Sequence, residues 1–570
     1  MGAARAPGRR VLVGAIRSRG RDVTLSTLLA TGHQAGEALV PVVIGVVIDQ
    51  AVTGGDTGAL VRWLVVLGLV FAGLSYSFRF GARFQERGAE RAEHALRLQI
   101  TERVLDARGG AEQGRLPGAL ANIATGDARR VGAVNLVLPA GFSAIAGLLV
   151  GATMLLRVSV PLGLLVFLGL PPVLWLAHRL GRPLERRSED EQERAAHASG
   201  VAADLVTGLR VLKGIGAERA AVDRYRRTSQ DSLAATRRAA GAQAWLGGAM
   251  VTLTGVFIAA VALVGGRLAA ADEISVGELV AAVGLAQFLL TPLSILSWVN
   301  GELAQARASA GRIAELLAAP PAVPSGTAAP PEPVRGRIRL AGVSHAALRN
   351  LDLETAPGEM LGVVARDPAA ATALLACLGR DLDPAAGEVE LDGVSLRDLD
   401  PADVRAAVLV AGHDAELFEG TLLDNVTACR PEPAAETVPE AVTAAMRAAA
   451  ADEVARALPE GTATPVAERG RSLSGGQRQR VALARALAAD PPVLVVHDPT
   501  TAVDAVTEAR IAAGLREARR GRTTIVVATS PALLAVADRV VVVEDGAAVA
   551  EGSHFDLVRD HAGYRSAVLS

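Results

Sequence analysis

Lysine is almost absent from this sequence. Of its 58 basic residues only Lys213 is a lysine, and all the others are arginines. A phosphate-binding loop normally uses a lysine to neutralise the β- and γ-phosphates of a nucleotide. The chain has no lysine available for such a loop. The arginine bias, with heavy use of Ala, Gly and Val, indicates a GC-rich genome, and we expect a bacterial source.

Cysteines are also few, and the net charge is small. The only cysteines are Cys377 and Cys429, and without a nearby Cys/His pair they predict neither a disulfide framework nor a zinc site. A reducing cytosol fits them. The net charge of −2 gives no global basic field, so we expect no nucleic-acid partner. No small-residue cleavage site follows the arginine-rich start, which indicates a cytosolic N-terminus rather than a signal peptide.

Apolar residues, in contrast, are abundant. They make up 50% of the 570 residues, and the mean hydropathy is +0.32. The chain is too long for one ordinary domain. Long apolar stretches occupy the first 300 or so residues and alternate with arginine- and glutamate-rich stretches. The pattern predicts a membrane half followed by a soluble half.

Six stretches are long and apolar enough to cross a bilayer, which needs about 20 such residues. The first is the weakest, because His33, Gln34 and Glu37 interrupt it. The six predicted spans are residues 24–50, 58–78, 133–156, 158–178, 244–265 and 276–299.

The distribution of arginine predicts the orientation of these spans. The two long connecting segments, about 79–132 and 179–243, are rich in arginine. Cytosolic segments carry the excess of positive charge, so both segments and both chain ends are expected in the cytosol. Acidic residues balance the arginines at helical spacing, which predicts helices that extend well beyond the membrane.

Three polar residues within the predicted spans are candidate substrate contacts. His33 and Glu37 are four residues apart and so share one helix face. An ionisable group inside a membrane is costly, and we expect these two to line a translocation cavity. The alternative is that they face water or pair with each other near a helix end. Gln287 is a further candidate, with helix–helix hydrogen bonding as its alternative.

Prolines mark the boundary between the two halves. Six of them fall within residues 318–335, which excludes a helix there. We therefore predict a transmembrane domain over 1–317, a proline-rich linker over 318–335 and a soluble domain over 336–570.

The most specific motif lies in the soluble half. Residues 473–480 read Leu-Ser-Gly-Gly-Gln-Arg-Gln-Arg and precede a helical run and the apolar strand 493–496. This stretch resembles the signature motif of ATP-binding cassette (ABC) transporters. Segments 118–124 and 208–218 resemble the two coupling helices of the exporter-type membrane domain. The resemblance implies a six-helix membrane bundle followed by an α/β P-loop NTPase-like nucleotide-binding domain.

The resemblance also implies a cofactor, ATP with Mg²⁺, bound between two subunits. In this family each nucleotide lies between the Walker motifs of one subunit and the signature motif of the other. The residues expected to contact ATP held by a partner are Ser474, Gly475, Gly476 and Gln477, and Asp504 corresponds to the D-loop aspartate. The N-terminus of a helix starting here suits the γ-phosphate.

The phosphate-binding loop of this chain departs from the family pattern. Residues 365–372 read Ala-Arg-Asp-Pro-Ala-Ala-Ala-Thr, so both motif glycines are alanines and Ala371 replaces the lysine. Only Thr372 matches, as a weak Mg²⁺–nucleotide contact. Pro368 also removes a backbone donor. Arg366 has the reach for a phosphate, but the adjacent Asp367 would repel one.

Four other positions of the same nucleotide site also differ from the family. His413 follows the strand after which a glutamine is usual, and His497 stands at the magnesium-site aspartate. Asp498 stands at the catalytic glutamate, and Thr529 at the switch histidine. Mg²⁺ prefers oxygen ligands, and we predict no metal site in the chain itself. We expect its own Walker site to be non-catalytic.

These expectations predict one subunit of a heterodimeric ATP-driven transporter in the cytoplasmic membrane. The partner would be a second ABC half-transporter with intact Walker motifs, and the chain alone would not hydrolyse ATP. It would contact membrane lipid and export an unknown small molecule, lipid or peptide. Two alternatives remain: a siderophore-type importer with the exporter fold, and a non-transporting membrane regulator derived from a transporter.

Overall fold

The computed structural model describes residues 5–413, 416–429 and 439–569, without the side chains of a few residues between 170 and 185. The chain divides into two compact units, and each is described by itself. Unit 1 comprises residues 1–100 and 118–316, and unit 2 comprises residues 101–117 and 317–570.

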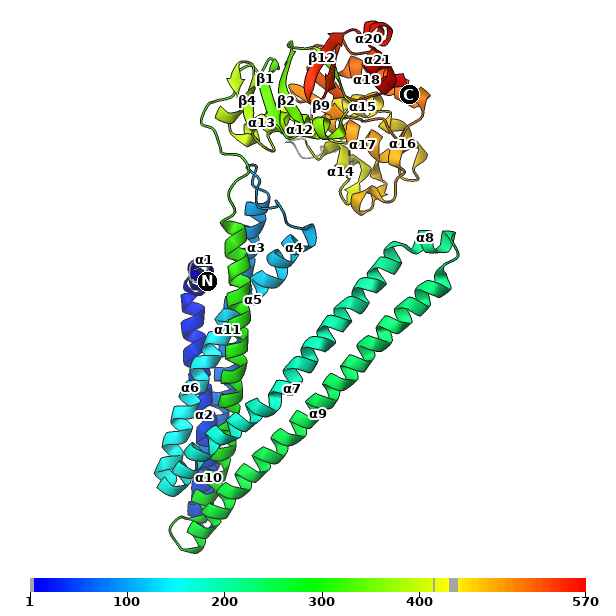
Figure 1. The fold of residues 1–570 in the computed structure, drawn as a ribbon. Coiled ribbons are helices and arrows are strands. Elements are labelled where there is room, and N and C mark those ends of the chain that lie inside the picture. The colour runs from blue at the N-terminus through cyan, green and yellow to red at the C-terminus, as the bar shows by residue number, and fades with distance from the viewer. Residues whose placement is uncertain (1–4, 414–415, 430–438, 570) are drawn as a thin grey trace. The chain divides into compact units, whose positions relative to one another are not determined.

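Unit 1 is entirely helical (Figure 1). Its elements are α1 (Arg5–Arg17), α2 (Gly20–Val47), the π-helix η1 (Ile48–Val52), α3 (Thr57–Val104), α4 (Pro117–Asn122), the π-helix η2 (Ile123–Asp127), α5 (Ala128–Gly132), α6 (Val134–Val158), α7 (Val160–Thr207), α8 (Leu209–Gly214), α9 (Glu218–Ala270), α10 (Val276–Phe288) and α11 (Leu290–Leu317). Each predicted span falls largely on these helices; the first runs from α2 into η1, and the sixth continues from α10 into α11.

Five long helical segments among the described residues have the length and apolar composition to cross a membrane: Gly20–Val52, Thr57–Val104, Pro117–Val158, Glu218–Ala270 and Val276–Leu317. The other predicted span, 158–178, lies on the first part of α7, where the apolar stretch is Val160–Val173. Some side chains of that span lie outside the described residues.

Helices α3, α7 and α9 extend far beyond the length of a membrane span. They contain 48, 48 and 53 residues, or roughly 70–80 Å at about 1.5 Å per residue. The hydrocarbon core of a bilayer is only about 30 Å thick. The predicted helical extensions are thus confirmed. Helices α7 and α9 pack side by side, and the short helix α8 joins their far ends (Figure 1).

An ion pair with a buried carboxylate joins the end of the first connecting segment to α11. The carboxylate of Asp127, only 1% exposed, accepts hydrogen bonds from the Ser309 hydroxyl at 2.9 Å and from Nε of Arg312 at 2.7 Å. Removing one partner of such a pair leaves a buried charge uncompensated. The contact therefore fixes the helix that leads into the linker against η2.

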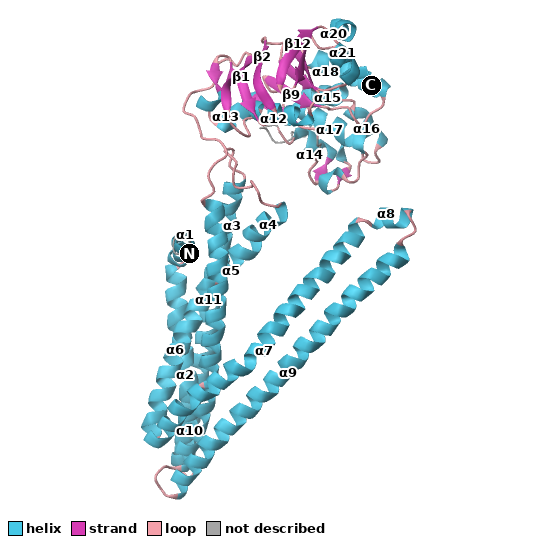
Figure 2. Ribbon diagram, viewed as in Figure 1, coloured by secondary structure: helices cyan, strands magenta, loops and turns pink. Residues whose placement is uncertain are grey.

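Unit 2 is an α/β domain built on two main sheets (Figure 2). The first sheet has the strand order β2-β1-β4-β5 and the second β12-β11-β3-β10-β9-β6. The strands are β1 (Ile338–His345), β2 (Leu348–Thr355), β3 (Met360–Ala365), β4 (Ala386–Leu391), β5 (Val394–Ser395), β6 (Val408–Ala411), β7 (Gly420–Thr421), β8 (Pro465–Val466), β9 (Val493–His497), β10 (Thr523–Val527), β11 (Arg539–Glu544) and β12 (Ala547–Gly552).

Helices cover this second sheet, whose central strands are buried on both faces and therefore consist of continuous apolar runs. The helices of unit 2 are α12 (Pro368–Leu378), α13 (Pro401–Ala407), α14 (Leu422–Thr427), α15 (Glu440–Ala448), α16 (Ala451–Ala457), α17 (Gly475–Ala488), α18 (Ala505–Ala518), α19 (Pro531–Ala535), α20 (His554–Asp560) and α21 (Ala562–Leu569), with the 3₁₀ turns η3 (Leu396–Asp398), η4 (Gly461–Ala463) and η5 (Glu468–Gly470).

The proline-rich linker is held by the last turn of α3 and by the segment that follows it. Arg103 donates to the carbonyl of Ala319 at 2.8 Å, and the backbone N–H of Ala322 donates to the carbonyl of Arg108 at 3.0 Å. Val323 is fully buried. These bonds explain why residues 101–117 group with unit 2 rather than with the other helices of the membrane half.

Candidate functional site

The parallel strands of the second sheet bring the predicted nucleotide residues to one edge. Strands β3, β10, β9 and β6 are parallel neighbours, so their carboxyl ends meet there. His497 ends β9, while His413 follows β6 and Thr529 follows β10. A cavity of about 680 Å³ is lined by Thr372, His413 and His497 among others. The two histidine rings lie 5.9 Å apart between centroids, edge to face.

The turn between β3 and α12 is closed by a side chain of its own. Asp367 is the N-cap of α12, and its carboxylate accepts a hydrogen bond from the backbone N–H of Ala369 at 2.9 Å. Pro368 occupies the first helical position, which its fixed φ favours. The helix N-terminus, the usual site for an anion, thus already has a carboxylate from the chain itself.

The other residues of this turn also have internal partners. The hydroxyl of Thr372 donates to the carbonyl of Pro368 at 2.9 Å. Ala371 is only 4% exposed and packs in a core cluster between the sheets and α12. Arg366 pairs with Glu544, with 3.3 Å between Nη1 and Oε1. Neither Thr372 nor Arg366 therefore has its polar group free of a protein contact.

The predicted magnesium and catalytic positions carry a histidine–aspartate pair. Nε2 of His497 lies 3.7 Å from Oδ2 of Asp498. The described residues contain no cluster of three or more His, Cys, Asp or Glu side chains placed to hold a metal ion. Thr529 is exposed.

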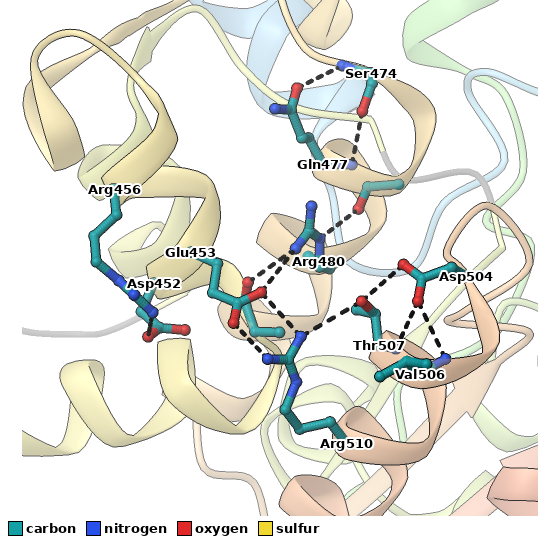
Figure 3. Close-up of polar contacts among 12 residues, drawn as sticks. Asp452, Glu453, Arg456, Ser474, Gln477, Arg480, Asp504, Val506, Thr507 and Arg510 are labelled. Carbon is teal, nitrogen blue, oxygen red and sulfur yellow. Dashed lines mark hydrogen bonds and ion pairs between the residues drawn. The ribbon is translucent and has the colours of Figure 1, made fainter.

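The signature motif forms a regular helix start. Ser474 is the N-cap of α17, its hydroxyl accepts from the backbone N–H of Gln477 at 3.3 Å, and its own N–H donates to Oε1 of Gln477 at 2.8 Å (Figure 3). This reciprocal pair is a capping box, which a serine followed three residues later by glutamine predicts. Ser474 is exposed at the N-terminus of a 14-residue helix, where the helix dipole favours an anion.

The signature helix contacts the D-loop segment directly. The side chain of Gln479 donates to the Thr501 hydroxyl at 2.7 Å and accepts from the backbone N–H of Ala502 at 2.9 Å. A Cβ atom on Gly476 would lie 2.4 Å from the carbonyl oxygen of Ala502. Glycine is therefore required at 476 by the close approach of the D-loop backbone.

Asp504 starts the next helix. Its carboxylate accepts from the backbone N–H groups of Val506 and Thr507, at 3.1 and 3.0 Å, and from the Thr507 hydroxyl at 2.8 Å (Figure 3). The hydrogen bonds from Thr507 hold the pKa of Asp504 below its usual range. Asp504 is thus an ionised N-cap of α18 at neutral pH.

A carboxylate from a third helix joins these two. Glu453 on α16 pairs with Arg510 of α18, and its Oε2 lies 3.7 Å from Nη1 of Arg480 on α17 (Figure 3). Arg510 also donates to the Thr507 hydroxyl at 3.4 Å. The signature helix and the D-loop cap are therefore linked through Glu453.

Sequence reasoning missed Glu453, Arg510 and the part played by Gln479. Gln479 is part of the signature motif, so a role for its side chain could have been predicted from the sequence. Glu453 and Arg510 lie 57 residues apart in the sequence, and no local pattern pairs them.

The three polar residues predicted for the membrane half are brought together. His33, Glu37 and Gln287 line one cavity of about 680 Å³ within unit 1. Nδ1 of His33 lies 3.1 Å from the carbonyl oxygen of Leu74. Among the described residues no ion pair joins His33 to Glu37.

Comparison with known proteins agrees with this architecture. Residues 23–293 match the ABC transporter transmembrane region, and residues 348–501 match the ABC transporter family. The chain is 31% identical to an ATP-dependent lipid A-core flippase of Thiobacillus denitrificans over 410 residues, which cover 71% of this chain and 70% of the flippase. The chain therefore belongs to the ABC transporter family, with a helical membrane domain fused to a nucleotide-binding domain.

Two other comparisons cover nearly the whole chain. It is 34% identical to a multidrug efflux ATP-binding/permease protein of Mycobacterium tuberculosis over 542 residues, 94% of this chain but only 45% of that protein. The chain thus spans less than half the length of that relative. A bacterial Atm1-family ABC exporter with ATP bound has the same fold, with a TM-score of 0.76, 23% identity and coverage of 97% of this chain and 98% of the other.

Proposed function

We propose that this chain is one subunit of a heterodimeric, ATP-driven exporter. The surface formed by its signature motif, here called the signature face, would complete the ATP site of its partner. The observation that carries the proposal is the contrast between two helix N-termini. The N-terminus of α17 is capped by the exposed hydroxyl of Ser474, whereas that of α12 is capped by the carboxylate of Asp367. A phosphate is attracted to the first and repelled by the second.

The residues of the chain's own Walker site do not fit Mg–ATP. No lysine is present to neutralise the phosphates, and the hydroxyl of Thr372 is bonded to the backbone of its own helix. His497 and Asp498 replace the oxygen ligand and the longer carboxylate that a water-activating site needs. We therefore expect no ATP hydrolysis at this site.

The signature face does fit the phosphate of a nucleotide held by another subunit. Ser474 would offer its hydroxyl, and Gly475 and Gly476 their backbone N–H groups, to the γ-phosphate. ATP itself supplies the phosphoryl group whose transfer to water drives the transport cycle. Asp504 would position the D-loop at the same boundary through its cap on α18.

The partner would supply what this chain lacks: a Walker lysine, a magnesium-site aspartate, a catalytic glutamate and a switch histidine. The relatives named for multidrug efflux and lipid A-core transport support export of an amphipathic small molecule or lipid. We place the assembly in the cytoplasmic membrane, with the nucleotide-binding domains in the cytosol.

The test is ATP hydrolysis by the chain alone and with a co-expressed partner. The chain alone is expected to show no turnover, and the pair is expected to hydrolyse ATP. Ser474→Arg in this chain should abolish the turnover of the pair, because the guanidinium fills the phosphate position. Substantial turnover by the chain alone would refute the proposal.

Ser553→Arg is the matched control. Ser553 is also a helix N-cap, accepting from the backbone N–H of Asp556 at 3.2 Å. Loss of the Ser553 cap should cost about as much helix stability as loss of the Ser474 cap, roughly 1 kcal/mol. Ser553, however, lies outside both the signature and the Walker motifs. The pair carrying Ser553→Arg should keep its ATPase activity. If Ser474→Arg were equally silent, a regulatory role would be favoured.

A further inference from the structure

The membrane-domain cavity that contains Glu37 has a distinctive chemical lining. It lies between α2, α3 and the α10–α11 segment and has a volume of about 680 Å³. One wall carries His33 and Glu37, one turn apart on α2, and another carries Gln287. Glu37 lies near the middle of the predicted span 24–50, so its carboxylate is placed at membrane depth.

Among the described residues that line the cavity, Glu37 is the only acidic one, and none is a lysine or an arginine. Within the part of the chain that the structure describes, its carboxylate has no ion-pair partner. A charged side chain inside a membrane is costly unless it has a partner or water. The cavity thus holds a carboxylate whose counter-charge the described protein residues do not provide.

The other polar groups of the cavity can also accept hydrogen bonds from a bound ligand. A carbonyl oxygen only accepts hydrogen bonds, so the contact at 3.1 Å requires Nδ1 of His33 to donate to Leu74. Nε2 of the neutral ring is then an acceptor. The Gln287 amide adds an acceptor oxygen beside its N–H donors, and the hydroxyls of Ser75 and Thr291 can accept as well as donate. Together with Glu37 these groups match a ligand that is positively charged or rich in N–H donors.

Two phenylalanines of α3 also line the cavity. Phe71 and Phe78 are two helical turns apart and share a face, and their side chains are 53% and 63% exposed in the single chain. The Phe78 ring centroid lies 5.5 Å from that of His33. Aromatic faces attract cations, and most strongly where water is excluded. They also bind the apolar body of a ligand.

We propose that this cavity binds organic cations with a bulky apolar body, with Glu37 as the counter-charge and Phe71 and Phe78 as the aromatic contacts. The inference rests on the proposed transport function and names the substrate class of that transporter. An anionic lipid or an anionic conjugate would place negative charge against Glu37 and is disfavoured by the same lining.

The experiment uses two probes of the same shape and opposite charge, tetraphenylphosphonium and tetraphenylborate. Equilibrium binding is measured to the full chain, alone and with its partner, in lipid nanodiscs without nucleotide, with empty nanodiscs subtracted. Tetraphenylphosphonium is expected to bind saturably and tetraphenylborate is not. Saturable binding of the borate with equal affinity would overturn the inference.

Variants then assign the binding to the cavity. Glu37→Gln should weaken tetraphenylphosphonium binding at least about ten-fold, because it removes the charge–charge attraction to the cation. Glu37→Asp, which keeps the charge, should retain most of it. Glu273→Gln removes an exposed carboxylate outside the cavity and should change nothing. Wild-type affinity in Glu37→Gln would overturn the assignment.

A second variant covers the case in which Glu37→Gln does not fold. Phe78→Leu keeps an apolar side chain but removes the ring, and it should weaken the phosphonium about three-fold or more. The binding assay needs no ATP, so its failure is separate from failure of the heterodimer proposal. If this chain and its partner hydrolyse ATP together but do not bind the phosphonium, only the proposal about the cavity is contradicted.

Discussion

Arg510 donates to the carboxylate of Glu453 from both of its terminal guanidinium nitrogens, one of them at 2.9 Å from Oε2. The pair connects α18, which Asp504 caps, with α16. Because Arg480 of α17 approaches the same carboxylate, a displacement of the signature helix changes the surroundings of the residue that holds α18. Gln479 provides a second and more direct link to the D-loop.

The first prediction concerns the energetic coupling in this pair. In a double-mutant cycle of Glu453→Gln and Arg510→Gln, we expect a coupling free energy of about 0.5–1 kcal/mol, since exposed ion pairs are worth little and this one is only partly exposed. The side chains are 34% and 50% exposed. Unfolding can be followed in the full chain by labelling Cys377 in a Cys429→Ser background, because Cys377 is buried and Cys429 is exposed.

The matched control for this cycle is Glu517 with Arg520, a pair on the surface that is 67% and 76% exposed. Its coupling should be near zero. Equal coupling in the two cycles would show that the bridge at Glu453 adds nothing beyond an ordinary surface contact. Glu453→Gln should also lower the ATP turnover of the proposed heterodimer, because it weakens one of the two links between the signature helix and the D-loop segment.

The second prediction separates the two glycines of the signature motif. Gly476→Ala should destabilise the nucleotide-binding domain by about 1–3 kcal/mol, the usual cost of overpacking, because its Cβ would meet the Ala502 carbonyl at 2.4 Å. Gly475→Ala should change stability by less than about 0.5 kcal/mol, since its Cβ meets only the Ala502 side chain at 3.4 Å. Cys377 labelling in denaturant measures both. Equal effects would contradict the packing argument.

Much of the fold could be predicted from the sequence because the signals are local. Apolar runs long enough to cross a bilayer, followed or preceded by charged residues at helical spacing, predict the long helices α3, α7 and α9. A serine followed three residues later by glutamine predicts the start of α17. Proline clustering predicts the end of the last membrane helix.

The rest depends on contacts between distant residues. Nothing local pairs Glu453 with Arg510, or groups residues 101–117 with the nucleotide-binding domain. The cap by Asp367 is a different case. An aspartate before a proline and an alanine run predicts a helix start from local sequence alone.

The third prediction concerns restoration of the phosphate-binding loop. Ala371→Lys alone should not create a nucleotide site, because Ala371 is buried and Asp367 still caps α12. Burying an ammonium group there should cost about 2–4 kcal/mol. Combining it with Ala365→Gly, Asp367→Ser and Ala370→Gly is expected to give photolabelling by an azido-ATP analogue in the chain without a partner.

The control for the added charge is Ala369→Lys, at an exposed position of the same turn. It should leave stability within about 0.5 kcal/mol of the parent and give no photolabelling. Photolabelling of Ala371→Lys alone, at the level of the combined variant, would show that the Asp367 cap is no obstacle to phosphate.

The last prediction concerns pH. Burial holds the pKa of His554 below its usual 6.5, and its Nδ1 lies 2.8 Å from the Tyr564 hydroxyl in a small core cluster. When the pH falls below about 6.5, the unfolded chain takes up a proton at this histidine before the folded chain does. Stability from His554 is therefore fully present above pH 6.5 and is lost as the pH falls through its folded pKa.

Between pH 7 and 5, the unfolding free energy of the wild-type domain should fall more steeply than that of His554→Gln. The difference in slope can reach at most about 1.4 kcal/mol per pH unit for one proton. Pulse proteolysis of the full chain measures it at each pH. His197→Gln, which changes an exposed histidine on α7, should keep the wild-type slope. Parallel profiles for wild type and His554→Gln would mean that His554 takes up its proton equally in the folded and unfolded chain.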